Sequence, residues 1–375
     1  MKKKLVVGII GCGYIADYYI KDLKFNKDLK IDCCFDIDKQ RLFKFSKYHQ
    51  IYPVNSIDSM LKKKNINIIL NLTPPENHFE INKKCLLNGK NVYSEKPLCL
   101  DFNESKYLMN LCKKRDLNLW TAPSIIFNEY SNLIRKKIIP KLSKYNTLGY
   151  AYFETPSLEK LNPEKWVNPS GAIWPLENEL LHGPIIEHSG YLISLLCSIF
   201  GPVKKVTSNP LKILDNSEKS LSKVKLKKIG YNHCTSNLFF ENNIVITLLI
   251  SEKTKSRRCL EIFDENISFL ISDLRDDFSP IVINDYKSKN FITSRANRIH
   301  QIVRKITHYF PTLLSIPFLT SNPFNYNQRI KTKKNSLSNF FKNEKPANFI
   351  NGILALANYM KNYKKEYFME DFFLH

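Results

Sequence analysis

The stretch that decides the fold is Leu5-Val-Val-Gly-Ile-Ile-Gly-Cys-Gly-Tyr-Ile-Ala16. An apolar, β-prone run ends in Gly11-x-Gly13-x-x-Ala16, and a helix-like segment follows at once. This pattern is typical of a strand, a tight turn and a helix that bind a dinucleotide. Gly11 permits the sharp turn, Gly13 allows the backbone to approach a pyrophosphate, and Ala16 keeps the helix close to the strand. The unpaired N–H groups at the start of the helix favour the phosphates.

A carboxylate ends the next predicted strand, as dinucleotide-binding domains require. Asp36 stands at the end of Ile31–Phe35. Such a group bonds the adenosine ribose hydroxyls and favours NAD, because a 2′-phosphate would meet a like charge. Lys39 and Arg41 are close by in the sequence and leave NADP possible. The alternative interpretation of Asp36 is a cap of the helix that follows.

Residues 1–122 alternate strand and helix patterns, which predicts a parallel sheet with helices on both faces. The further predicted strands are Ile31–Phe35, Ile51–Val54, Ile66–Leu72, Asn91–Tyr93 and Asn118–Ala122. The predicted helices after the first are Lys39–Tyr48, Ser56–Lys63, Glu76–Leu87 and Phe102–Arg115. This is the length and order of a complete dinucleotide-binding domain, so residues 123–375 are expected to form a second domain.

A second informative stretch, Ser94-Glu-Lys-Pro-Leu98, follows the fifth predicted strand. It therefore lies at the carboxyl edge of the sheet, where open α/β sheets bind ligands. Pro97 restricts Lys96 to an extended conformation and so sets the direction of its amine, beside the expected position of a nicotinamide. The alternative interpretation is a plain charged turn.

The net charge of +22 over 375 residues is unusually high. It would suit a nucleic-acid or membrane-surface binder, whose test is salt-sensitive retention on DNA or anionic vesicles. The lysines are scattered in short groups, however, without the aromatic–basic interleaving of a nucleic-acid module. We therefore expect no nucleic-acid or membrane partner, and a positive surface that favours an anionic substrate or nucleotide.

The nine cysteines show no Cys-x-x-Cys pair, which indicates reduced thiols and a cytoplasmic protein. The apolar run at residues 5–10 is shorter than the core of a signal peptide. No apolar run reaches the length needed to span a membrane. We expect no metal site.

Four motifs, in this order and spacing, resemble the glucose–fructose oxidoreductase / inositol dehydrogenase / MocA family. They are Gly11-x-Gly13-x-x-Ala16, Asp36, Thr73-Pro-Pro-Glu-Asn-His78 and Glu95-Lys-Pro97. The resemblance implies an α/β Rossmann domain followed by an α+β domain with a large, open, mostly antiparallel sheet. It also implies hydride transfer between NAD(P) and a hydroxyl of a sugar, inositol or nucleotide-sugar, and a homo-dimer or homo-tetramer.

The helix expected after Gly183 carries the proton chemistry in most of this family, as Asp followed four residues later by His. Here those positions are Glu187 and Tyr191, which resembles a branch that keeps an acid and a Tyr. A tyrosine with a pKa near 10 takes a proton poorly at neutral pH but donates one readily during carbonyl reduction. His188 is an alternative acid or base if the helix is rotated. The remaining alternative is a purely structural helix, with the chemistry lost.

The resemblance implies roles for further residues. Glu95 would contact the nicotinamide ribose, and Lys96 would hold the reacting oxygen, while Glu187 would bind substrate or support Tyr191. The expected cofactor-binding residues are Gly11, Gly13, Tyr14, Ile15, Asp36, Thr73, Pro74, Asn77, His78, Glu95 and Lys96. The expected substrate-binding residues are Lys96, Trp166, Asn168, Glu187, His188 and Tyr191. His78 taken alone would be a capping or surface residue, and Trp166 alone would pack under a proline-containing loop.

Further elements are expected in the second domain. The predicted helices are Asn128–Ile139 and a last one at about 346–363, which the resemblance packs back on the first domain. The predicted strands are Gly149–Phe153, Val203–Ser208, Ser236–Phe240, Ile244–Glu252 and the segment Cys259–Ser272. Basic and apolar residues mix over 280–320, which predicts a surface helix or subunit contact rather than a membrane-surface helix.

We therefore expect an NAD(P)-dependent oxidoreductase acting on a sugar-like substrate. The competing hypothesis is a catalytically inactive, cofactor-binding regulatory protein, motivated by the missing Asp/His pair.

Overall fold

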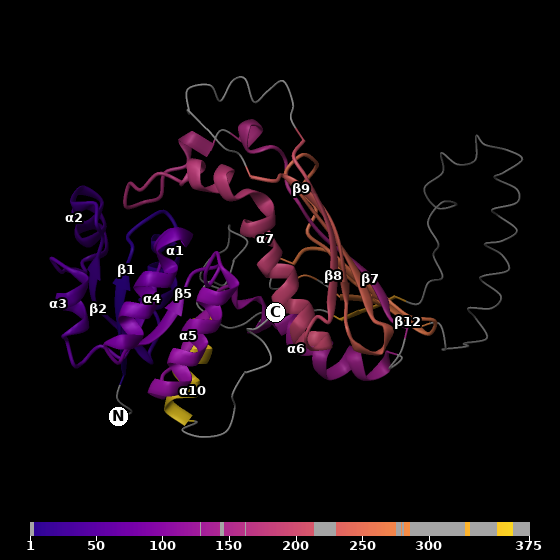
Figure 1. Ribbon diagram of the computed structural model, residues 1–375, viewed down its shortest axis with the longest axis horizontal. Coiled ribbons are helices and arrows are strands. Elements are labelled where there is room, and N and C mark those ends of the chain that lie inside the picture. Colours follow the sequence, from indigo (N-terminus) through magenta and orange to yellow (C-terminus); the bar gives the residue numbers. More distant parts are fainter. Residues whose placement is uncertain are drawn as a thin grey trace, which may run out of the picture.

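The computed structural model describes residues 4–127, 129–142, 146–161, 163–213, 230–274, 279, 281–285, 327–330 and 351–362. They form two domains that face each other across one long helix, α7 (Leu176–Phe200) (Figure 1). The parallel sheet lies on one side of this helix and the larger sheet on the other.

The first domain is a six-stranded parallel sheet in the order β3-β2-β1-β4-β5-β6. Its strands are β1 (Leu5–Ile10), β2 (Leu29–Phe35), β3 (Tyr52–Pro53), β4 (Ile68–Asn71), β5 (Asn91–Ser94) and β6 (Leu119–Thr121). Its helices are α1 (Ala16–Leu23), α2 (Lys39–His49), α3 (Ile57–Leu61), α4 (His78–Leu87) and α5 (Phe102–Arg115). The predicted order of elements is confirmed. The predicted helix Glu76–Leu87 begins as a separate 3-10 turn, η1 (Pro75–Asn77), because Pro74 is extended and Pro75 starts the turn.

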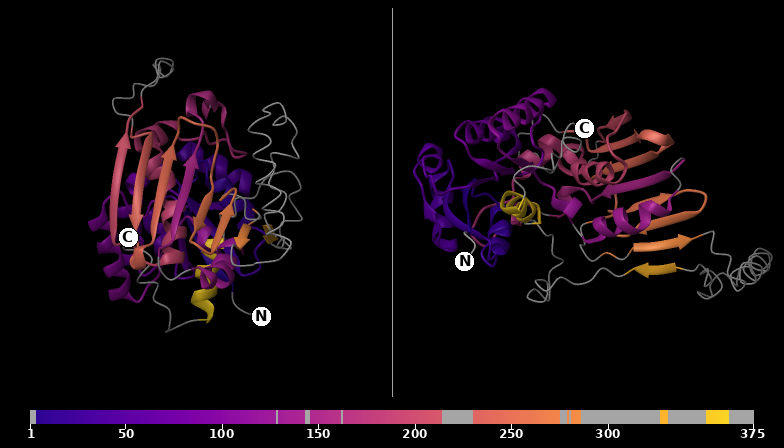
Figure 2. Two further views of the ribbon diagram at one scale, coloured as in Figure 1. Left: turned by 90° about the vertical axis from the view of Figure 1, so that its right-hand side faces the viewer. Right: turned by 90° about the horizontal axis from the view of Figure 1, so that it is seen from below.

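The second domain is built on a mixed, mostly antiparallel sheet, in which eight strands are described in the order β14-β13-β12-β11-β7-β10-β9-β8 (Figure 2). The strands are β7 (Leu148–Glu154), β8 (Lys205–Leu211), β9 (His233–Phe239), β10 (Val245–Ser251), β11 (Leu260–Phe263), β12 (Ile267–Ile271), β13 (Ile281–Asp285) and β14 (Asn327–Ile330). The predicted segment Cys259–Ser272 is a hairpin of two strands. Asp264 turns it, because its Oδ1 accepts from the N–H of Asn266 at 2.7 Å and of Ile267 at 2.8 Å.

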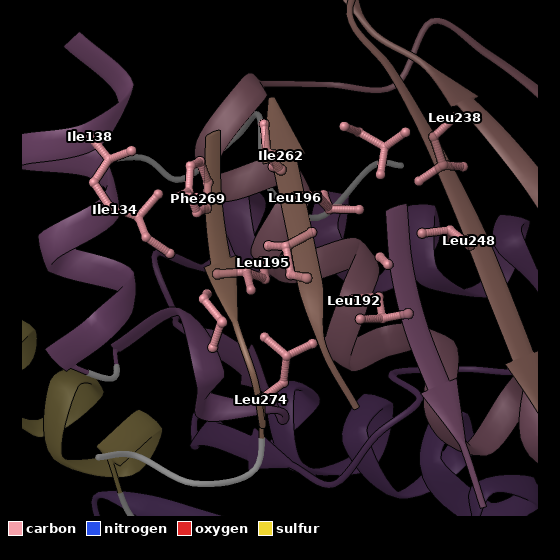
Figure 3. Packing of buried hydrophobic residues seen from close by; sticks show 14 of the residues in the cluster. Ile134, Ile138, Leu192, Leu195, Leu196, Leu238, Leu248, Ile262, Phe269 and Leu274 are labelled. Atoms are coloured by element: carbon pink, nitrogen blue, oxygen red, sulfur yellow. The ribbon is translucent and has the colours of Figure 1, made fainter. Parts of the chain in front are cut away.

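Helices cover one face of this sheet, and their apolar side chains form the core of the domain. The core side of α7 packs on the sheet through Leu192, Leu195 and Leu196, which lie against Ile262 of β11 and the neighbouring strands (Figure 3). Burial of each such side chain stabilises the fold by roughly 1.5–3 kcal/mol. Strand β7 shows the resulting alternation, with Ala151 buried and Tyr150 exposed on the opposite face.

The predicted helix Asn128–Ile139 is broken into pieces. These are η2 (Ser124–Phe127), α6 (Glu129–Leu133), a π-helical turn η3 (Ile134–Ile138) and η4 (Ile139–Lys141). The wide turn keeps Ile134 and Ile138, both fully buried, on the core face (Figure 3). Helix α7 is likewise two helices joined at Gly183, whose φ of 67° and ψ of 172° are non-helical. It begins at Leu176, before Gly183, after which the helix was expected.

Among the described residues, α7 alone is long and apolar enough to cross a membrane by length and composition. This differs from the expectation that no run would meet that length. Its apolarity is explained by the core, because Leu195 and Leu196 are completely buried inside the second domain.

The chain returns to the first domain through α10 (Asn351–Asn362), as predicted. Ile353, Leu356 and Ala357 join the core of the first domain, and a Cβ at Gly352 would lie 2.7 Å from Cζ of Tyr93. Position 352 requires a glycine, because any larger side chain would collide with the ring of Tyr93. Residues 281–285, expected within a basic surface helix or subunit contact over 280–320, form strand β13 instead. The rest of that segment, 286–320, and the start of the last helix at 346–350 lie outside the described residues.

Candidate active site

The glycine turn after β1 forms an open cradle beside the first helix. Gly11 has a φ of 95°, and a Cβ there would lie 2.7 Å from the carbonyl of Leu72, so the turn requires glycine. At Gly13 a Cβ would meet no other group within 4 Å, so the space beside this glycine is open. Among the described residues no side chain caps α1, whose N-cap is Ile15. The Ala16 N–H donates to the carbonyl of Gly13 at 3.1 Å, and the start of the helix, which carries no side-chain cap, suits an anion such as a phosphate.

A hairpin from the second domain holds the far side of this turn. Asn168 is buried, and its Nδ2 donates to the carbonyl of Tyr14 at 3.1 Å and of Gly13 at 3.4 Å. The Ser170 N–H donates to Oδ2 of the buried Asp17 at 2.8 Å. Asn168 thus braces the phosphate loop, which differs from the expectation that it binds substrate.

Two tryptophans close the base of the same hairpin. The rings of Trp166 and Trp174 meet edge to face at 5.1 Å between centroids, and Val167 pairs with Ile173. Trp166 therefore supports the hairpin, in agreement with its alternative interpretation as a packing residue. The hairpin reaches over the first domain toward α2 (Figure 1).

The carboxylate of Asp36 is fully engaged at the end of β2. Oδ2 accepts from the Cys12 N–H at 2.8 Å and from Nε of Arg41 at 3.0 Å. Oδ1 accepts from the Asp38 N–H at 2.8 Å and from Nη2 of Arg41 at 3.1 Å. A carboxylate offers about four lone-pair positions, so ribose hydroxyls reach Asp36 only when Arg41 moves. The expected role of Asp36 is thus conditional on its neighbour.

The loop after β4 is tied to the loop after β5 by a buried histidine. His78 is completely buried, with Nδ1 2.6 Å from the carbonyl of Pro97 and Nε2 2.7 Å from the carbonyl of Thr73. Burial lowers its pKa, although the two carbonyls act in the opposite direction. His78 therefore holds the two loops together from behind and does not line the cofactor space, contrary to expectation. Pro74 and Asn77 are exposed beside it.

Glu95 is oriented by the first helix. Its Oε1 accepts from the hydroxyl of the buried Tyr19 at 2.6 Å, and its Oε2 accepts from the Lys96 N–H at 2.9 Å. The Glu95 carboxylate therefore lies between helix α1 and the loop after β5. A ribose hydroxyl would find it already aligned, because one accepting position on each oxygen remains.

Lys96 and Glu187 meet although 91 residues separate them. The Lys96 ammonium donates to Oε2 of Glu187, and only 6% of the Glu187 side chain is exposed. Burial would lower the pKa of Lys96, but the Glu187 carboxylate outweighs it and holds that pKa above its usual range. Burial also opposes ionisation of Glu187, yet His182 and Lys96 lower its pKa to about 2. Both groups are therefore charged at neutral pH.

Tyr191 lies one turn beyond Glu187 on α7, on the face that Glu187 turns to the first domain. Its ring stacks on Phe153 at 5.5 Å, and its hydroxyl is near enough to Lys96 to affect the pKa of that group. His188 also stacks on Phe153, at 4.6 Å. The helix therefore places Glu187 against Lys96 and packs His188 on the sheet.

Three ionisable residues at the site were missed from the sequence: Glu76, Glu179 and His182. His182 lies 3.5 Å from Glu187 and 3.3 Å from Glu76. Burial, then the Glu187 charge, raises the pKa of Glu179 to about 8. For Glu179 and His182 the sequence did hold a signal. Two glutamates, 177 and 179, and His182 come directly before Gly183-Pro184, where a helix must bend. Within the described ranges no cluster of His, Cys, Asp and Glu suits a metal ion.

The cradle at Gly13, the start of α1 without a side-chain cap and the aligned Glu95 fit a dinucleotide. A model of an oxidoreductase family with an NAD-binding Rossmann fold matches residues 5–122. An uncharacterized oxidoreductase of Synechocystis sp. PCC 6803 is 22% identical over 285 residues, which are 73% of each chain.

Solved structures share the fold at low identity. The WlbA dehydrogenase of Bordetella pertussis, in complex with NADH and UDP-GlcNAcA, superposes with a TM-score of 0.61 at 15% identity, over 73% of this chain and 75% of that one. KijD10, a 3-ketoreductase of Actinomadura kijaniata in complex with TDP-benzene and NADP, reaches 0.67 at 13% identity, over 99% and 93%. The matching model, that of the glucose–fructose oxidoreductase / inositol dehydrogenase / MocA oxidoreductases, covers the first domain of this chain, residues 5–122.

Proposed function

We propose that the protein transfers a hydride between NAD(P) and a hydroxyl or carbonyl carbon of a sugar derivative. The observation that carries this proposal is the Lys96 ammonium, held by the buried Glu187 at the carboxyl edge of the sheet, beside the glycine cradle. An ammonium fixed there polarises a substrate oxygen. When bound, the nicotinamide supplies or receives the hydride, and the protein handles orientation and protons.

Tyr191 is the proposed proton donor and acceptor for that oxygen. Its position on the Glu187 face of α7 and its electrostatic coupling to Lys96 support this role. In the direction of reduction, the substrate carbon gains the hydride and the oxygen gains the phenolic proton. The nearby ammonium favours the phenolate that remains.

The proposed substrate is a nucleotide-sugar or another anionic sugar derivative. The WlbA and KijD10 structures were solved with nucleotide-linked ligands, UDP-GlcNAcA and TDP-benzene. The net charge of +22 supports an anionic substrate, because a positive field speeds the encounter with an anion.

The experiment is a spectrophotometric screen of the purified protein at 340 nm. Nucleotide-sugars, free sugars and inositols are offered with NAD⁺ or NADP⁺, and the corresponding ketones with NADH or NADPH. Lys96→Met should lower kcat at least about 10²-fold while NADH binding, followed by its fluorescence, is kept. Lys106→Met, an exposed lysine on α5, is the matched control.

Full activity of Lys96→Met would refute the catalytic role of Lys96. Cofactor binding without turnover of any compound in the panel would instead favour the regulatory protein. That second candidate is supported by the replacement of the family's Asp/His pair with Glu187 and Tyr191.

We also propose a cytoplasmic location, which the described cysteines support because all nine are free thiols and eight are buried. A homo-oligomer is also proposed, because among the described residues no helix packs on the sheet face that presents Tyr150 at 43% exposure (Figure 2). Light scattering of the purified protein tests the oligomer, and a monomeric mass would overturn it.

A further inference from the structure

Ionisable side chains form a line from the surface to Lys96. Glu76 of η1 is the outer member, with 41% of its side chain exposed, and His182 is next, with 6% exposed. Nε2 of His182 lies 3.3 Å from Oε1 of Glu76, and its Nδ1 lies 3.5 Å from Oε1 of Glu187. Oε2 of Glu187 accepts from the Lys96 ammonium. Each imidazole nitrogen therefore faces a carboxylate at ion-pair distance, and the buried Nδ1, which makes no hydrogen bond in the structure, is the one that faces the group holding Lys96.

The kink in α7 creates this alignment. At Gly183 the backbone leaves the helix, and a Cβ there would fall on the carbonyl of Tyr231. A Cβ at Gly230 would lie 2.7 Å from the backbone of His182. Two glycines thus allow a backbone crossing that fixes His182 against the next helix turn. A continuous helix would separate positions 182 and 187 by 500° of rotation, or 140° net, and they would face apart.

The charges around His182 favour its protonated form. The Glu187 carboxylate is the main cause of its raised pKa, with burial acting against it and Glu76 and Glu179 adding to it. Asn178 orients the outer carboxylate, with Nδ2 3.4 Å from Oε2 of Glu76. The Gly230–Tyr231 segment packs on this turn through its backbone, so within the part of the chain that the structure describes the charges that face the imidazole come from η1 and α7. His182 consequently lies between the partly exposed Glu76 and the buried Glu187.

We propose that His182 is a positioning residue that resupplies Lys96 with protons through Glu187, with Glu76 as the contact with water. This inference rests on the proposed function. In carbonyl reduction Tyr191 gives its proton to the substrate oxygen, and the phenolate then takes a proton from the Lys96 ammonium. His182 then gives its Nδ1 proton to Oε1 of Glu187, the carboxyl group turns, and Nζ takes the proton. The neutral ring keeps its Nε2 proton and then turns over, so that the bare Nδ1 takes a proton from water beside Glu76, and the solvent loses one proton for each alcohol formed.

The first test needs no substrate. Histidine ring resonances are followed by NMR against pH in the full-length protein. The His182 pKa should exceed that of an ordinary histidine and should fall in both Glu187→Gln and Glu76→Gln. His233→Gln, which removes a half-buried histidine on β9, serves as control and should leave it unchanged. A His182 titration that does not respond to Glu187→Gln overturns the inference.

The second test uses whichever carbonyl substrate the screen identifies. His182→Gln keeps a polar side chain but cannot relay a proton, and should lower kcat about 10-fold or more, with little change in KM. It should also remove the fall in kcat that accompanies deprotonation of His182, and added imidazole should restore part of the rate in His182→Gly. An unchanged pH profile in an active enzyme refutes the relay, whereas absence of any turnover by the wild type refutes the proposed function.

Discussion

Replacement of Arg41 by alanine should change which cofactor the protein binds. The Arg41 guanidinium takes two of the about four accepting positions of Asp36, and backbone N–H groups take the other two. With Arg41 in place, the buried carboxylate is neutralised and a 2′-phosphate can be met by the guanidinium. Without Arg41, Asp36 keeps its charge and two of its accepting positions are open to ribose hydroxyls.

The expected loss of NADPH affinity follows from the two hydrogen bonds that the Arg41 guanidinium can make to the 2′-phosphate. Two hydrogen bonds to a charged group are worth roughly 1.5–3 kcal/mol each. The Arg41 side chain is 40% exposed, so solvent screening reduces the sum to about 2–3 kcal/mol. This corresponds to a Kd for NADPH that is about 30- to 150-fold weaker in Arg41→Ala. The Kd for NADH should stay the same or tighten a few-fold.

The assay is a fluorescence titration of wild type and variant with NADH and with NADPH, which requires no substrate. Lys39→Ala is the matched control, because Lys39 is exposed and adjacent but does not bond Asp36; its effect should be small and should vanish at high salt. Circular dichroism confirms that each variant folds. An NADPH affinity that is unchanged in Arg41→Ala would refute the assignment of Arg41 to the 2′-phosphate.

Two further predictions concern stability. Gly11→Ala should destabilise the fold by roughly 2–5 kcal/mol, because the new Cβ lies 2.7 Å from the carbonyl of Leu72 at a φ that disfavours side chains. Gly89→Ala is the control, because Gly89 also has a positive φ but a Cβ there would meet no other group; it should cost only about 1–2 kcal/mol. Equal denaturant midpoints for the two variants would contradict this reasoning. Glu179 has a pKa raised from 4.5 to about 8, so the folded state binds more protons between these values and stability falls as pH rises through them. Glu179→Gln should therefore raise the Tm at pH 8.5 more than at pH 5, and parallel Tm–pH curves would show that Glu179 is not perturbed.

Local patterns predicted the first domain closely. Strand β1, its glycine turn and helix α5 coincide with their predicted bounds or differ by one residue. The signals there are short-range, since alternation of strand and helix, caps and glycines act over a few residues. The break of Asn128–Ile139 was not predictable in that way, because the π turn at η3 is selected by the core that Ile134 and Ile138 must reach.

The sequence by itself determined that the chain holds a dinucleotide-binding domain, where its glycine turn lies and that Lys96 stands at the ligand edge of the sheet. Tertiary structure alone decided what surrounds these groups. Asp36 is covered by Arg41, His78 lies behind the loops, and His182 joins Lys96 through Glu187. The reason is that these contacts depend on a domain interface and on a kink at Gly183, which bring together residues whose separation along the chain carries no periodic signal.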